Sequence, residues 1–139
     1  MLNVLRKYVK DTKEDWNYIT PTDFYKQYFS KKPMKNNYIT IDLRKKEDYK
    51  QFHMPGSINI FWLDLLKTRN LNRIIKYQQQ VKKIFLICYV GHTSSQAMTL
   101  LRLLGIPVTS IKFGYGLSPL SNVPIAGWLQ YHYPLSCKK

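Results

Sequence analysis

Carboxylates are missing from more than half of this sequence. All 8 Asp and Glu residues lie within residues 1–64, whereas residues 65–139 carry 10 Lys and Arg and no acidic side chain. The absence excludes paired-carboxylate chemistry from the second half, and a positive potential there favours anionic substrates or partners. The formal charge of the whole chain is +14, from 22 Lys and Arg against 8 Asp and Glu. No recognisable RNA-binding motif accompanies this charge, so we do not expect nucleic acid as a partner.

Cysteine and long apolar runs are also scarce. The two cysteines, Cys88 and Cys137, lack the C-x-x-C spacing of a zinc or redox pair, and we expect neither a metal nor a cofactor. No stretch approaches the ~18 apolar residues of a membrane span, and residues 1–7 lack the apolar core of a signal peptide. These features predict a protein of the reducing cytoplasm with no membrane partner.

The sequence is long and hydrophobic enough for one folded domain, because 45% of its 139 residues are hydrophobic. Strands are predicted at 38–43, 57–60, 84–87 and 108–111, and helices at about 21–29, 71–80 and 94–104, with a short helix just before residue 53. Asn70 is expected directly before one helix, and Thr93 and Ser94 are expected to cap another. This alternation predicts an α/β fold whose central sheet of about five strands is mostly parallel and flanked by helices.

Residues 1–17 are interpreted as an N-terminal extension, 18–135 as the domain and 136–139 as a tail. The segment from Gly114 onward is expected to wrap the sheet.

Cys88 directly follows the buried apolar run 84–87, and residues 89–94 connect it to an amphipathic helix. Ligands of open α/β sheets bind at the carboxyl ends of the strands, where this connection would lie. Backbone N–H groups curled around the thiol by Gly91, together with a helix N-terminus, would bind an anion and stabilise a thiolate. A nucleophilic cysteine is one interpretation, and a buried packing cysteine is the other.

The neighbours of the thiol have two interpretations as well. His92 is either an exposed loop residue or a substrate contact. The hydroxyls of Thr93 and Ser94 can cap the helix or contact an anion. Tyr89 can simply pack beside the loop.

The segment Cys88-Tyr-Val-Gly-His-Thr-Ser94 resembles the active-site loop of the rhodanese (thiosulfate sulfurtransferase) family, which is typically Cys-x-x-Gly-x-(Arg/Thr/Ser)-Ser. Ile41-Asp42-Leu43-Arg44 and the segment from Phe52 to Ile60 are similar to two further family motifs in the same order. Phe113 to Gly116, Gly127-Trp128 and Pro134 are similar to its closing segment. The resemblance spans about residues 18–135.

The resemblance implies a rhodanese-like fold and a sulfurtransferase. Cys88 would take a sulfane sulfur from a small anionic donor such as thiosulfate, hold it as a persulfide, and pass it to cyanide or a thiol, including a protein thiol. It implies substrate binding by the loop residues Tyr89, Val90, Gly91, His92, Thr93 and Ser94. Structural roles fall to Asp42, Arg44 and His53. Many members have Arg where this chain has Tyr89 and Thr93, so the donor preference stays open.

Three other functions remain as alternatives. A catalytically silent rhodanese-like module would bind or regulate a partner without chemistry, although silent copies often lose the cysteine. A cysteine phosphatase would need Cys-x5-Arg, and position 94 is Ser. Delivery of sulfur to tRNA is suggested only by the net charge. Cys137 would be either a resolving thiol or a plain tail thiol.

Overall fold

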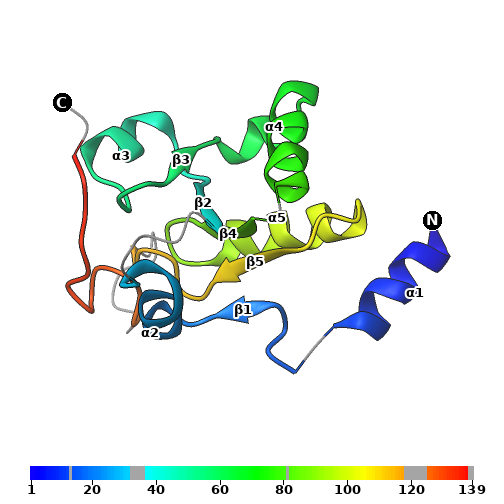
Figure 1. Cartoon of the computed structure of the whole chain (residues 1–139), viewed down its shortest axis with the longest axis horizontal. Coiled ribbons are helices and arrows are strands. Elements are labelled where there is room, and N and C mark those ends of the chain that lie inside the picture. Colours follow the sequence, from blue (N-terminus) through cyan, green and yellow to red (C-terminus); the bar gives the residue numbers. More distant parts are fainter. Residues whose placement is uncertain (13, 32–36, 81, 118–124, 138–139) are drawn as a thin grey trace.

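Five parallel strands form a single sheet in the computed structural model, which describes residues 1–12, 14–31, 37–80, 82–117 and 125–137. The strands are β1 (Tyr18–Ile19), β2 (Tyr38–Asp42), β3 (Ile58–Asn59), β4 (Lys83–Ile87) and β5 (Val108–Ile111), and their order is β1-β5-β4-β2-β3 (Figure 1). All four neighbouring pairs are parallel. The α/β fold class and its parallel sheet of about five strands are therefore confirmed.

The middle strand β4 is buried on both faces, as its unbroken apolar sequence predicts. Ile84 and Leu86 face a core that also contains Ile74 of α4 (Thr68–Gln79) and Leu101 of α5 (His92–Leu103). The alternate residues of β4 face a second core. That core contains Phe85, Ile87, Phe24, Ile111, Met54, Tyr115 and Trp128. Because successive side chains of a strand alternate, one strand anchors both layers.

The second core is covered by a helix that changes type along its length. Thr20 caps α2 (Pro21–Phe24), and its side chain accepts a hydrogen bond from the Asp23 N–H at 3.1 Å. The chain continues without a break into the π-helical segment η1 (Tyr25–Phe29). Together they cover the predicted helix at 21–29, and in Figure 1 they lie on the side of the sheet away from α4.

The short helix α3 (Lys46–Gln51) and the 3-10 turn η2 (Trp62–Asp64) flank β3.

The prediction for the start of α4 was wrong. Asn70 lies buried inside α4, as the third residue of the helix, which begins at Thr68. Its side-chain amide donates to the Asp64 carbonyl at 2.7 Å, so Asn70 ties the helix to η2 instead of capping it.

The helix α1 (Leu2–Asp11), the strand β1 and the 3-10 turn η2 were not predicted. The helix α1 buries none of its residues and stands at the end of the molecule in Figure 1, with one hydrogen-bond-length contact of 3.3 Å between the hydroxyls of Tyr8 and Thr99. The strand β1 has only two residues, too few for a periodicity, and is held by pairing with β5. Across the part of the chain that is described, no helix is long and apolar enough to cross a membrane.

The C-terminal segment contacts the second core through Trp128, Leu129 and Tyr133, as predicted for a chain that wraps the sheet. Trp128 is fully buried, and its indole N–H donates to the Pro134 carbonyl at 2.8 Å. Ser136 exchanges two backbone hydrogen bonds with His53, at 2.8 and 2.7 Å. The rest of the predicted wrapping segment, at 118–124 and 138–139, lies outside the described residues.

Candidate active site

Cys88 directly follows the middle strand β4, and the helix α5 begins only four residues later. The residues 88–94 are called the cysteine loop below. Gly91 is the N-cap of α5 and turns the chain with φ of +99°, a conformation that L side chains rarely adopt. A Cβ at this position would also lie 3.0 Å from the backbone nitrogen of Phe113. This turn therefore needs a glycine, and it folds the loop back over the sulfur.

The sulfur of Cys88 is surrounded by hydrogen-bond donors. The backbone N–H groups of Gly91 and Ser94 donate to Sγ at 3.2 and 3.3 Å, and Ser94 Oγ lies 3.4 Å from it. Cys88 is only 1% exposed, so these groups act with little competition from water. Amide donors at the start of a helix favour negative charge on the atom they surround. The arrangement can stabilise a thiolate and charge that develops on a bound sulfur.

Ser94 is not a helix cap, and neither is Thr93, which corrects the sequence prediction. Gly91 occupies the cap position, and no side chain caps α5. Thr93 is half-buried in the first turn, whereas the Ser94 hydroxyl is fully buried and points to the sulfur and to Ser110 Oγ, 2.8 Å away. Among the other loop residues, Val90 is half-buried and His92 is exposed.

Tyr89 points away from the sulfur and toward α3. Its hydroxyl donates to the Asp48 carboxylate and accepts from the Lys45 N–H at 3.3 Å. Burial is the main reason that the pKa of Tyr89 is raised, and the hydrogen bond to Asp48 adds to it. This side chain therefore anchors the cysteine loop to α3. The partner residue Asp48 lies 41 positions earlier, and no local sequence pattern indicates the pairing.

Residues 112–117, called the supporting loop below, lie directly against the cysteine loop. The Tyr115 N–H donates to the Cys88 carbonyl at 3.0 Å, and the Leu117 N–H donates to the Tyr89 carbonyl at 2.9 Å. A Cβ at Gly114 would overlap the Cys88 carbonyl oxygen and lie 2.9 Å from its carbon. The backbone carrying the thiol is thus held by a second backbone at van der Waals distance.

Asp42 and Arg44 hold the supporting loop from the interior. Their side chains are 0% and 1% exposed and form an ion pair at 3.1 Å. The Tyr115 hydroxyl donates to Asp42 at 2.8 Å and accepts the Met54 N–H at 2.8 Å, while the Arg44 guanidinium lies 4.0 Å above the Tyr115 ring. Burial raises the pKa of Tyr115 far above its ordinary value, with the Asp42 charge as the second cause.

His53 lies away from the cysteine loop. Its ring stacks on Tyr49 with centroids 3.9 Å apart, and Nδ1 donates to the Tyr49 carbonyl at 2.8 Å. Its backbone pairs with Ser136, as described above. The structure thus brings Gly91 and Ser94 to the Cys88 sulfur. The side chain of Tyr89 contacts α3 instead, and His53 packs on Tyr49.

The sequence is similar to proteins of one known family. The family model described as "Rhodanese-like domain" matches residues 25–116. This chain belongs to the rhodanese-like domain family. The adenylyltransferase and sulfurtransferase UBA4 of Yarrowia lipolytica is 30% identical over 96 residues, which cover 69% of this chain and 22% of that protein. The rhodanese-like chain therefore spans about a fifth of the length of this curated relative.

Two solved structures share the rhodanese-like fold. A rhodanese-related protein from Thermoplasma volcanium superimposes with a TM-score of 0.63 at 21% identity, covering 87% of this chain and 98% of the other. The thiosulfate sulfurtransferase of Pseudomonas aeruginosa gives 0.60 at 16% identity, covering 87% of this chain and 19% of that one. At these identities the likeness is one of fold.

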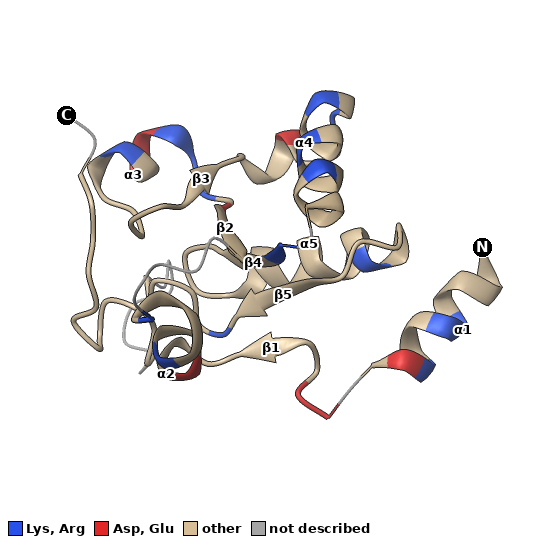
Figure 2. Cartoon of the chain, in the orientation of Figure 1, with Lys and Arg blue, Asp and Glu red and all other residues tan. Residues whose placement is uncertain are grey.

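No acidic residue of this rhodanese-like chain follows Asp64, so the whole of β4, the cysteine loop and α5 carries only basic or neutral side chains (Figure 2). The carboxylates near the cysteine loop come only from the first half of the sequence. Asp48 reaches the loop through Tyr89, and Asp42 is paired with Arg44. Both acids are therefore engaged by partners, and the sulfur faces two backbone N–H groups and the Ser94 hydroxyl.

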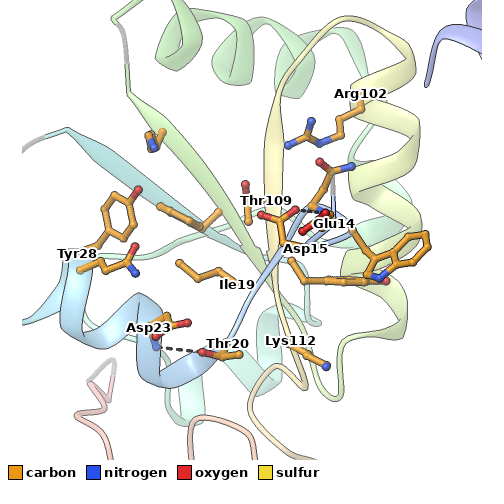
Figure 3. A pocket seen from close by; sticks show the side chains of 15 residues that line it. Glu14, Asp15, Ile19, Thr20, Asp23, Tyr28, Arg102, Thr109 and Lys112 are labelled. Atoms are coloured by element: carbon orange, nitrogen blue, oxygen red, sulfur yellow. Dashed lines mark hydrogen bonds between the residues drawn. The ribbon is translucent and has the colours of Figure 1, made fainter. Parts of the chain in front are cut away.

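A cavity of about 600 Å³ lies elsewhere in the molecule. It is lined by residues 14–20, by α2 and η1, and by residues such as Lys83, Arg102 and Lys112, with no contribution from residues 88–94 (Figure 3). In the described residues, no group of three or more His, Cys, Asp or Glu could hold a metal ion. Both cysteines are free, Cys88 buried and Cys137 exposed.

Proposed function

We propose that this rhodanese-like protein transfers a sulfane sulfur through a persulfide on Cys88. The observation that carries the proposal is the pair of N–H groups, from Gly91 and Ser94, that donate to the buried Cys88 sulfur at 3.2 and 3.3 Å. These donors stabilise an anionic nucleophile without an ionisable base. The second half of the chain contains no carboxylate that could serve as one.

The reaction balances as two displacements at sulfur. The Cys88 thiolate attacks the outer sulfur of thiosulfate, a new S–S bond forms, and sulfite leaves with the electron pair of the broken S–S bond. The persulfide then carries the negative charge. A thiolate or cyanide attacks its outer sulfur, and Cys88 leaves again as the thiolate. We propose thiosulfate or a related small anion as donor and a thiol, including a protein thiol, as acceptor.

The remaining loop residues have matching roles in this proposal. Tyr89 through its main chain, Val90, Gly91, His92, Thr93 and Ser94 form the rim of the sulfur site, and Asp42, Arg44 and His53 hold the surrounding structure. We propose residues 18–135 as the working domain, 1–17 as an extension and 136–139 as a tail. A free thiol in this role requires a reducing compartment, and we propose the cytoplasm.

Mass spectrometry of the intact protein after thiosulfate treatment tests the proposal. We expect a mass increase of one sulfur on Cys88 and release of that sulfur as thiocyanate when cyanide is added. Cys88→Ser should lose both signals, while Cys137→Ser should keep them. An unmodified Cys88 with several sulfane donors would contradict the proposal and favour a rhodanese-like module that only binds a partner.

Phosphatase activity should be negligible. A cysteine phosphatase grips the phosphate with Arg at the sixth position after the cysteine, and that position holds Ser94, whose hydroxyl lies 3.4 Å from the sulfur. A neutral hydroxyl cannot make the bidentate contact of a guanidinium. Turnover of p-nitrophenyl phosphate should therefore be equal in the wild type and in Cys88→Ser. A rate that depends on Cys88 would revive the phosphatase alternative.

A further inference from the structure

Ser110, on β5, is a buried hydroxyl next to the candidate active site. It is 0% exposed, and its Oγ lies 2.8 Å from Ser94 Oγ, which in turn lies 3.4 Å from the Cys88 sulfur. The register of the sheet explains the proximity, because Ser110 pairs with Leu86, two residues before Cys88. Three polar groups thus form one continuous row: the Cys88 thiol directly after β4, the Ser94 hydroxyl of α5 and the Ser110 hydroxyl of β5.

The direction of the hydrogen bonds follows from counting protons. A buried hydroxyl has one proton to donate, and within the described part of the chain Ser94 Oγ is the only partner of Ser110 Oγ. Ser110 therefore donates to Ser94. Because Ser94 Oγ already accepts this bond, its own proton is directed toward the Gly91 carbonyl, 3.2 Å away, or toward the sulfur.

The Gly91 carbonyl has little need of the Ser94 proton. It also accepts from the Ser95 N–H at 3.1 Å and from the Ser95 hydroxyl at 2.7 Å. A carbonyl oxygen has two lone pairs, so Ser94 is the third donor and the most distant of the three. Rotation of the Ser94 hydroxyl from this carbonyl toward the sulfur therefore leaves no acceptor unsatisfied.

We infer that Ser110 is a positioning residue for sulfur transfer: it fixes Ser94 so that the Ser94 hydroxyl can donate to Cys88 whenever the sulfur is anionic. The inference rests on the proposed function. With a neutral thiol, the S–H donates to Ser94 and Ser94 donates to Gly91. With a thiolate, the Ser94 hydroxyl turns to the sulfur as a third donor beside the two backbone N–H groups, and the bond from Ser110 strengthens it.

The charge on Sγ changes twice in a catalytic cycle. It moves to the outer sulfur when the persulfide forms, and it returns when the acceptor removes that sulfur and Cys88 leaves as a thiolate. The third donor therefore acts most strongly in the second displacement, since a better stabilised leaving thiolate departs faster. Loss of the Ser110 hydroxyl should slow the transfer from persulfide to cyanide about five- to tenfold, the effect of about one hydrogen bond.

A matched pair of variants isolates the hydroxyl. Ser110→Thr keeps it and Ser110→Val replaces it with a methyl group of the same shape, so any packing strain is common to both. Each is made in a Cys137→Ser background, where Cys88 is the one remaining cysteine. Rates of thiocyanate release from pre-formed persulfide should be five- to tenfold lower in the Val variant than in the Thr variant.

A second measurement needs no sulfur donor. The pH profile of Cys88 alkylation by iodoacetamide, a neutral reagent, should be displaced to higher pH in the Val variant relative to the Thr variant. The ionisable groups on the elements around the cysteine loop are the same in both variants and cancel in the comparison. They are Tyr89, His92, Asp42, Arg44, Asp48, Lys45, Lys112 and Tyr115. Because alkylation is independent of sulfur donors, failure of the proposed function leaves this result interpretable.

A double-mutant cycle tests whether Ser110 acts through Ser94. Ser110→Ala, which adds no volume, should displace the alkylation profile when Ser94 is present and should have no further effect in a Ser94→Ala background. Identical profiles for the Thr and Val variants, or equal effects of Ser110→Ala in both backgrounds, would overturn the inference. Thermal unfolding of every variant identifies those that alter the fold instead.

Discussion

Gly114 illustrates how closely the backbone is packed behind the cysteine. Gly114→Ala should destabilise the protein by roughly 2–4 kcal/mol and reduce sulfur uptake, because the new Cβ would overlap the Cys88 carbonyl. Gly56→Ala is the matched control. Its φ of +81° is also left-handed, but nothing lies within 4 Å of the added Cβ, so it should cost only about 1 kcal/mol. Urea unfolding of both variants measures the difference, and equal losses would contradict the overlap.

The buried ion pair of Asp42 and Arg44 should contribute strongly to stability. Asp42→Asn should destabilise the protein by about 3–5 kcal/mol, because it leaves the 1%-exposed guanidinium without a charged partner. Asp11→Asn, which breaks the exposed pair with Lys7 on α1, should have no measurable effect. Urea unfolding at neutral pH compares them, and a small effect at Asp42 would mean that the Asn side chain replaces the carboxylate adequately.

Local sequence patterns predict the position of the cysteine but not the long-range contacts around it. The position of Cys88 after a buried strand could be predicted, because an unbroken apolar run followed by an amphipathic repeat is a local pattern. The contacts of Tyr89 with Asp48 and of Tyr115 with Asp42 join residues 41 and 73 positions apart. No local pattern encodes such pairs. Hydroxyl side chains usually cap helices, so the sequence predicts Thr93 and Ser94 as caps of α5. The left-handed turn at Gly91 instead places both inside the first turn.

At the scale of elements, Tyr115 joins the end of β2 to the supporting loop, and its ionisation couples this junction to pH. Its pKa is raised in the folded state by burial and by Asp42. A raised pKa means that the folded protein keeps the proton after the unfolded chain has lost it, so the contribution is complete below about pH 10 and is lost as the pH rises further. The free energy of unfolding should decline above pH 10.

Tyr115→Phe tests this coupling. The variant should be less stable than the wild type at pH 7, because it loses the hydrogen bond to Asp42, but its stability should decline less steeply above pH 10. The expected difference in slope is up to about 1.4 kcal/mol per pH unit. Tyr131→Phe, which removes an exposed tyrosine hydroxyl, is the control substitution. Urea unfolding at a series of pH values measures the slopes, and parallel curves for Tyr115→Phe would refute the coupling.

Some helices and strands could be predicted from local sequence patterns, and others could not. The strands β4 and β5 and the helix α5 follow from hydrophobic periodicity and from Gly105 and Pro107 at the end of the helix. The helix α1 was missed because its segment was interpreted as a polar extension, and it buries nothing that would mark a core face. The strand β1 owes its existence to pairing with β5 in space, and two residues carry no period.

At the scale of the whole molecule, the charge of +14 should act on the donor more than on the fold. The rate at which the thiosulfate dianion loads Cys88 should fall roughly three- to tenfold between about 0.02 M and about 0.5 M ionic strength, as screening removes electrostatic attraction. Alkylation by neutral iodoacetamide should change little over the same range. Stopped-flow or quenched measurements on the Cys137→Ser protein compare the two reagents. Equal salt dependence would show that the charge is ordinary solvated surface.

The place of β4 in the strand order has a consequence for any acceptor. The strand is the third of five, so β5 and β2 flank the cysteine on both sides, and helices and aromatic side chains cover both faces of the sheet. Because Cys88 is 1% exposed, we expect a partner to approach end-on, along the strand direction. A small molecule satisfies this easily. A protein acceptor would have to present its thiol at the tip of a protruding or extended segment, because a thiol recessed in its own surface could not reach the sulfur.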